Sequence, residues 1–69
     1  MTSNDRVIAA FNRSVAKGNG RNAALLDAAR AEHNNVTVGC FATAARDLGF
    51  TTEQATLLWQ QVAREPKPS

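Results

Sequence analysis

Apolar residues recur at intervals of three and four along this chain, in four segments separated by short polar or glycine-containing stretches. This spacing is typical of amphipathic α-helices, because residues three and four apart share one helix face. The first segment should begin near Ser3–Asp5, where short polar side chains can cap a helix, and end at Gly18–Gly20. Its inner stripe is predicted to consist of Ile8, Phe11 and Val15.

The second segment predicts a helix over about residues 22–33, with His33 at the surface near its end. Asn34-Asn35 should end it, since Asn tolerates the left-handed backbone conformation better than most residues other than Gly. The periodicity assigns several charged residues to the solvent side, namely Asp27, Arg30, Glu32 and Asp47. The inner side of this second helix is expected to be formed by Leu25, Leu26, Ala28 and Ala29.

The third segment should begin with Thr37 as its N-cap and end at Gly49. Val36 and Phe41 flank the predicted start at the spacing of a hydrophobic staple, in which the two side chains pack together across the cap. The buried positions then follow an i, i+3, i+4, i+7 pattern that comprises Phe41, Ala44, Ala45 and Leu48.

The fourth segment has the clearest start signal. Thr51 and Gln54 have the spacing of a capping box, in which each side chain binds the backbone N–H of the other residue. Pro66 should end this helix at Glu65, because proline disfavours helix in the residue before it. Residues 66–69 are expected to be a frayed tail. The buried face is predicted to consist of Ala55, Leu58, Trp59 and Val62.

Together these segments predict an all-α fold: a single domain over residues 1–65, built as a compact bundle of about four short helices. A 69-residue domain buries only about 60% of its unfolded surface, so a monomer would be marginally stable. Cys40 is the only cysteine, which excludes an internal disulfide, and Cys40 with His33 cannot complete a zinc site. We therefore expect no metal, no cofactor and an inert, buried thiol, and we predict that the chain is supported by self-association, as a homodimer, or by docking on a partner.

Several classes of function are disfavoured by the sequence. No carboxylate pair or nucleophile with a neighbouring base is spaced for catalysis, so we expect neither an enzyme nor a small-molecule substrate. No segment approaches the ~20 apolar residues of a membrane span, and the first residues lack the layout of a secretory signal. A cytoplasmic location is therefore expected. The net charge of +2 permits a polyanionic partner without demanding one.

One stretch, Phe41 to Gln60, has a recognisable layout: FATAARDLGFTTEQATLLWQ. A small residue stands where a second helix would cross closely (Ala45), a glycine follows four residues later at the turn (Gly49), and an apolar residue and a hydroxyl cap come next. Ala55 and Leu58 are then spaced to hold the second helix inward. These twenty residues resemble the helix-turn-helix of small bacterial and phage repressors.

The resemblance implies a DNA-binding regulator of transcription that inserts its last helix, residues 52–65, into the major groove as a dimer. The positions that match the base-reading face of the family are Thr51, Thr52, Glu53, Thr56, Leu57 and Gln60. Phosphate contacts would come from Arg46, Arg64 and Lys67. The last helix departs from the family in having no Arg or Lys before Arg64, and Glu53 would stand close to phosphates.

A second hypothesis belongs to another class. The chain would be a small protein–protein interaction module, such as a phage- or plasmid-encoded inhibitor of a host protein, that uses the exposed face of the last helix. Leu57 lies roughly opposite the predicted buried stripe, and an exposed patch formed by Leu57 with the edge of Trp59 would suit a dimer or partner interface.

Overall fold

The computed structural model describes residues 2–65, which form four helices and no strand. These are α1 (Ser3–Ala16), α2 (Arg21–Glu32), α3 (Val38–Asp47) and α4 (Thr52–Arg64). The expected all-α class is confirmed. The radius of gyration is 10.9 Å, close to the ~11 Å of a compact domain of this length. The predicted tail at 66–69 lies outside the described residues.

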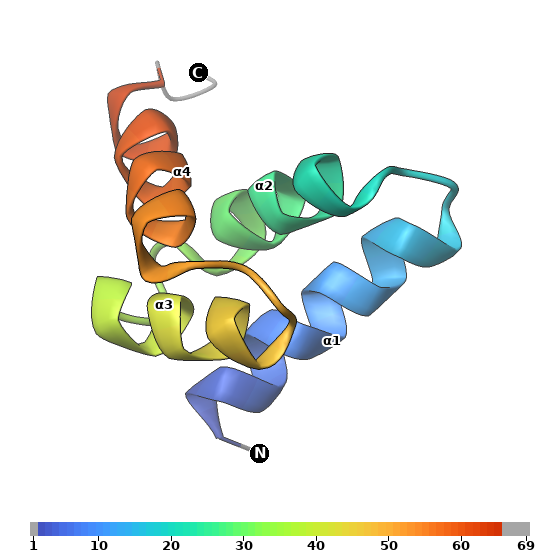
Figure 1. The fold of residues 1–69 in the computed structure, drawn as a ribbon, viewed down its shortest axis with the longest axis horizontal. Helices are drawn as coiled ribbons and strands as arrows, with labels where there is room; N and C mark the ends of the chain where they lie inside the picture. Colours follow the sequence, from blue (N-terminus) through green and yellow to red (C-terminus); the bar gives the residue numbers. More distant parts are fainter. Residues whose placement is uncertain (1, 66–69) are drawn as a thin grey trace.

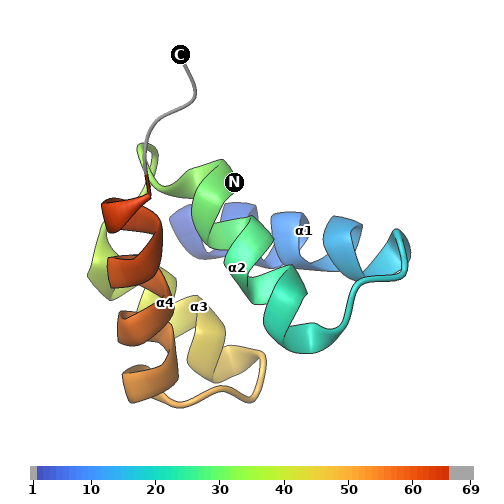
Figure 2. The ribbon, with the colours of Figure 1, turned by 90° about the horizontal axis from the view of Figure 1, so that it is seen from above.

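The helices contact one another in a closed ring rather than as a stack of sequential pairs. α1 packs on α2 and on α3, and α4 packs on α3 and on α2. Figure 1 shows α1 and α2 running in opposite directions, with α4 lying across α3 rather than alongside it. Seen from above, in Figure 2, α4 stands at one side of the domain with the end of α2 next to it. The core lies inside this ring.

Short polar side chains begin three of the four described helices, at the predicted residues Thr37 and Thr51 and, for α1, at Thr2, just before the predicted Ser3–Asp5. The Thr37 hydroxyl accepts a hydrogen bond from the Cys40 N–H at 3.2 Å, and Thr51 and Gln54 form both bonds of the predicted capping box. α1 begins with a second capping box, between Thr2 and Asp5. Each satisfies N–H groups that would otherwise lack a partner. α2 begins at Gly20 without a side-chain cap.

The core is built largely from alanine. Among residues 2–65, thirteen apolar residues are buried, and seven of them are alanines, which let the helix backbones approach closely. Phe41, Leu25 and Val7 are the largest fully buried side chains. Val36 is buried in the same cluster as Phe41, which agrees with the predicted staple. The alanines are Ala10, Ala24, Ala28, Ala29, Ala44, Ala45 and Ala55.

The predicted inner stripe of α1 is wrong in register. Val7 and Ser14 are buried with Phe11, whereas Ile8 is half-buried and Val15 is 41% exposed. The periodicity of apolar residues pointed to Val15 because a serine carries no hydrophobic signal. Ser14 is buried because its hydroxyl donates a hydrogen bond to Asp27 on α2, at 2.6 Å. In α2, likewise, Ala24 is fully buried and Leu26 only partly so.

The end of α2 also differs from the prediction. Neither Asn34 nor Asn35 adopts a left-handed conformation, since within residues 2–65 positive φ is confined to glycine. α2 ends at Glu32, whose carbonyl accepts hydrogen bonds from the N–H groups of Asn35 and Val36 and so needs no left-handed residue. His33, expected at the surface, is instead half-buried and stacked on Trp59.

Two carboxylates that the sequence assigned to the solvent side, Glu32 and Asp27, are less exposed than predicted. Glu32 is buried, and its carboxylate accepts a hydrogen bond from Arg6 of α1 at 2.7 Å and one from Asn35. Asp27 is half-buried against Ser14. A helical repeat cannot distinguish a solvated carboxylate from one that faces a cation on a neighbouring helix. Arg30 and Asp47 are exposed as expected, and Cys40 is half-buried rather than buried.

Candidate nucleic-acid interface

The corner between α3 and α4 is closed by a glycine in the left-handed conformation. Four residues, 48–51, separate the two helices. The N–H of Phe50 donates to the carbonyl of Ala45 at 2.9 Å, and that of Gly49 donates to the carbonyl of Arg46 at 3.0 Å. This pair of bonds is the Schellman motif, which requires a positive φ at its glycine, and Gly49 has φ +96°. The predicted turn is therefore present.

The two helices meet through small residues. Ala45 on α3 and Ala55 on α4 are both fully buried, as the layout of the sequence requires. Phe50, which follows the glycine, is 9% exposed and meets Phe11 of α1 edge-to-face, with 6.0 Å between ring centroids. The corner is thus anchored on the core by one aromatic side chain.

Arg21, a residue for which the sequence offers no signal, contacts this corner from the outside. Arg21, the first residue of α2, places its guanidinium over the rings of Phe50 and Phe11, at 5.1 and 5.7 Å from their centroids. The same guanidinium donates a hydrogen bond to the carbonyl of Leu48, at the end of α3. Arginine favours both contacts, since its planar cation stacks on aromatic faces and carries several donors.

The outward side of α4 is polar and exposed. At about 100° per residue, the side directly opposite Ala55 and Leu58 is occupied by residues 53, 57, 60 and 64. Leu57 is 60% exposed, and Glu53, Gln60 and Arg64 are exposed as well. Within the described chain, the side chains of these four residues make no hydrogen bond or ion pair. This face is therefore available to a partner over the full length of the helix.

The predicted reading residues at the start of α4 differ in their availability. Thr51 is exposed, but its hydroxyl accepts from the N–H of Gln54 at 3.1 Å, so it serves as a cap. Thr52 is exposed, and its backbone carbonyl accepts a bond of 2.9 Å from the hydroxyl of Thr56, which is half-buried. The structure thus brings the predicted residues onto one helix, while two of their three hydroxyls are already engaged.

The two arginines predicted as phosphate contacts that the structure describes lie at the ends of α3 and α4. Arg46 lies in the last turn of α3 and Arg64 in the last turn of α4, and both are exposed. Neither is part of an ion pair among residues 2–65. The third predicted phosphate contact, Lys67, lies outside the described residues. Glu53, in the first turn of α4, remains the one carboxylate on the outward line of the helix.

The end of α4 is tied back to α2 by an exposed ion pair. The guanidinium of Arg30 donates two hydrogen bonds to the carboxylate of Glu65, at 2.8 and 3.0 Å. The hydrogen bond with Glu65 raises the pKa of Arg30, and the same bond lowers the pKa of Glu65. Exposed pairs of this kind contribute little to stability, so the contact orients the last turn more than it stabilises it.

Trp59 and Leu57, predicted as one interface patch, point to different sides of α4. Trp59 is half-buried, stacked on His33 with 4.4 Å between ring centroids and tilted against Phe41 at 5.2 Å. Nε2 of His33 is buried and has no hydrogen-bond partner among the described atoms. The indole therefore joins α4 to α2 and α3, and Leu57 is the exposed apolar residue of the outward face.

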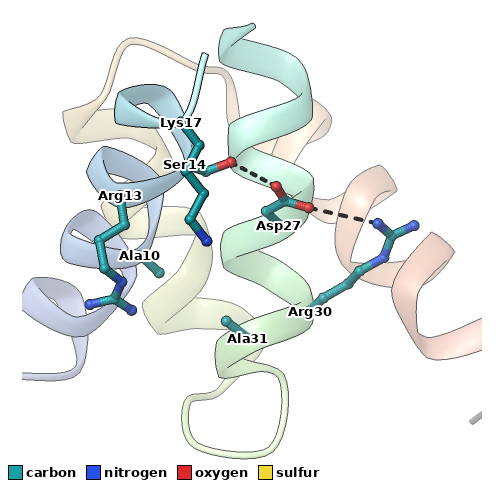
Figure 3. Close-up of a pocket in the computed structure, with 7 residues that line it drawn as sticks. All are labelled: Ala10, Arg13, Ser14, Lys17, Asp27, Arg30 and Ala31. Carbon is teal, nitrogen blue, oxygen red and sulfur yellow. Dashed lines mark hydrogen bonds and ion pairs between the residues drawn. The ribbon is translucent and has the colours of Figure 1, made fainter. Parts of the chain in front are cut away.

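A groove lies between α1 and α2, away from the outward face of α4. Figure 3 shows this groove, of about 510 Å³, with Ser14 and Asp27 joined across it and Arg30 reaching Asp27 from the other side at 3.8 Å. Ala10 and Ala31 leave it open because neither can fill it. The Ser14 hydroxyl donates its hydrogen bond to the Asp27 carboxylate, and Asn19 donates to the same carboxylate oxygen at 3.2 Å. No cluster of metal-ligating side chains occurs in the described part of the chain.

Comparisons of the chain with protein-family models, curated proteins and solved structures found no match. Among the described helices, none combines the length and the apolar character needed to cross a membrane. The candidate interface is therefore defined by the geometry of α3, α4 and the corner between them.

Proposed function

We propose that this protein binds double-stranded DNA as a dimeric regulator, with α4 inserted into the major groove. The observation that supports the proposal is the α3–α4 corner: a Gly49 turn, small buried residues at the crossing, and a capped helix with an exposed polar side. A major groove accepts one α-helix, and the amide and hydroxyl groups on this side are of the type that contacts base edges. The single thiol, Cys40, suits the reducing cytoplasm in which such a regulator acts.

The charge distribution suggests weak, moderately salt-dependent binding. Arg46 and Arg64 supply two phosphate contacts per protomer, and Glu53 opposes them. Four contacts in a dimer correspond to a slope of log K against log salt of about −3.6. Measuring the affinity from ~50 to ~200 mM salt tests this value, and the double variant Arg46→Gln, Arg64→Gln should abolish most of the slope.

A dimer is supported by the dimensions of the domain and its small core. The domain measures 30 × 26 × 24 Å, so two copies side by side can present their α4 helices about 34 Å apart, one turn of DNA. The core contains few large side chains, and association would bury further apolar surface. We therefore expect a palindromic site with half-sites one helical turn apart.

Fluorescence anisotropy with duplexes from the DNA upstream of the gene, at ~50 mM salt, tests the function directly. The variant Thr52→Ala, Gln60→Ala should weaken binding at least tenfold, because each lost base contact costs about 1–3 kcal/mol. A matched control, Asn12→Ala with Asn22→Ala, removes two exposed amides from α1 and α2 and should leave the affinity unchanged. If the folded wild-type protein binds no duplex under these conditions, the proposal is wrong.

The second candidate, a protein-interaction module that inhibits a host protein, is favoured by the 60% exposure of Leu57. In that case Leu57→Asp should abolish a one-to-one complex with a specific protein partner. The control is Val15→Asp, which places the same charge at an exposed apolar residue of α1. DNA binding that survives competition by cell lysate would argue against this candidate.

A further inference from the structure

We infer that α4 reads consecutive A·T base pairs, with Leu57 against a thymine methyl group and Gln60 on the adjacent adenine. The inference rests on the DNA-binding function proposed above and goes beyond it by naming the bases. It follows from which side chains of α4 the fold leaves free and from what those side chains can recognise.

The fold removes several polar groups from the list of possible readers. The side chains of Thr51 and Gln54 are held by the capping box, with bonds of 3.0 and 3.1 Å. The Thr56 hydroxyl donates a hydrogen bond to the backbone carbonyl of Thr52, at 2.9 Å. A hydroxyl that has donated its proton can offer only an acceptor, so Thr56 is a weak reader of base edges.

The side chains that remain directly outward are few. Of the four residues on the outward line, 53, 57, 60 and 64, Leu57 and Gln60 lie in the middle of α4, with Glu53 one turn before and Arg64 one turn after them. Leu57 and Gln60 are three residues apart and so are neighbours on the helix surface. Both are exposed, and Gln60 makes no hydrogen bond within residues 2–65. Gln61 is turned further to one side by the helical repeat. Two adjacent side chains of this spacing reach adjacent base pairs.

The chemistry of these two residues favours A·T pairs. A glutamine amide matches the N7 acceptor and N6 donor of adenine, and an aliphatic side chain contacts the 5-methyl group of thymine. Guanine is read most often by Arg or Lys, and the sequence from Asp47 to Ala63 contains neither. The carboxylate of Glu53 can only accept, so it cannot read guanine; its acceptors fit the N4 donor of cytosine or the N6 donor of adenine, and it lies one turn before Leu57. Arg46 and Arg64 lie beyond this stretch, where they complement the phosphates.

Replacing thymine by uracil removes the proposed apolar contact without disturbing base pairing. Selection from a random duplex pool by the wild-type protein supplies the sites, which should be enriched in A·T pairs at the centre of each half-site. Uracil at the contacted position should weaken wild-type binding about fourfold, as expected for exposing one methyl-sized group. Leu57→Ala should bind the thymine and uracil duplexes equally, whereas the control Val15→Ala should keep the fourfold difference.

A matching pair of variants tests the adenine contact. Gln60→Ala should lose its preference for adenine over 2-aminopurine or guanine at one position, and Gln61→Ala should retain it. Selection of G·C pairs at the centre, or a thymine–uracil difference that persists in Leu57→Ala, overturns the base assignment while DNA binding stands. Failure of the folded protein to retain any duplex overturns the proposed function, and the base assignment with it.

Discussion

The glycine at the α3–α4 corner can be tested against a second glycine of nearly the same conformation. Gly49 has φ +96° and Gly18 has φ +97°, and both close a helix through the same pair of backbone hydrogen bonds. Their surroundings differ. A Cβ atom at Gly18 meets nothing within 4 Å, whereas one at Gly49 would lie 3.2 Å from Nη2 of Arg21. Alanine substitutions at the two positions therefore separate backbone strain from displacement of Arg21.

The expected magnitudes follow from these two terms. An L-residue held in the left-handed conformation costs about 1–2 kcal/mol, so Gly18→Ala should lower the free energy of unfolding by this amount. At roughly 4–8 °C per kcal/mol, the melting temperature falls by about 4–16 °C. Gly49→Ala also forces Nη2 of Arg21 to shift by a few tenths of an ångström, which weakens its contacts with Leu48 and Phe50. Because these contacts are exposed, we expect an additional loss of about 1 kcal/mol.

The assay is urea and thermal unfolding, followed by circular dichroism, of both glycine variants in the wild-type and Arg21→Ala backgrounds. The excess loss at Gly49 should be present in the wild type and absent when Arg21 is removed, as in a double-mutant cycle. If Gly49→Ala is unfolded at 25 °C, all the variants are compared in sucrose, which favours the compact state. Equal losses at both glycines in the wild type, or an excess that persists without Arg21, would refute the reasoning.

Three further predictions concern the core, the partly buried ion pair of Arg6 and Glu32, and the assembly. Leu25→Ala empties a fully buried position and should cost about 2–5 kcal/mol in urea titrations; a loss below 1 kcal/mol would contradict its place in the core. The hydrogen bond from Arg6 lowers the pKa of Glu32, and a hydrogen bond from Asn35 lowers it further. The ionised carboxylate therefore stabilises the fold at pH values above the ordinary pKa of glutamate. This stability is lost as the pH falls through the lowered pKa, and Glu32→Gln should flatten the acid side of a plot of melting temperature against pH; an unchanged plot would exclude the pair as its cause. For a dimer, the melting temperature should rise with protein concentration, and a constant value over a hundredfold range would argue for a monomer.

Helix ends were the part of the fold most accessible from the sequence. The capping box of Thr51 and Gln54, the N-cap at Thr37 and the glycine at 49 are local signals, and each is realised in the structure. Their accuracy has a physical reason: a cap satisfies backbone groups within three or four residues of itself, so the interacting partners are adjacent in the sequence.

Contacts between distant residues could not be predicted in the same way. Arg21 meets Leu48 across 27 positions, and Glu32 meets Arg6 across 26, with no local pattern to connect them. The burial of Ser14 depends on a distant partner, because its hydroxyl donates a hydrogen bond to Asp27 on α2. For the candidate site, the sequence indicated which residues of α4 face outward, apart from the half-buried Thr56, but which hydroxyls are already engaged became apparent only with the helix in place.

The ring of helix contacts has a consequence for how α4 is held in the domain. α3 rests on α1 and α4 rests on α2, so the two arms of the corner are held by different supports. The tilt of α4 is then governed by the way α1 and α2 pack together, through the alanines between them. Replacing one of these alanines by a larger residue would therefore change the tilt of α4 while leaving every outward residue of α4 unchanged.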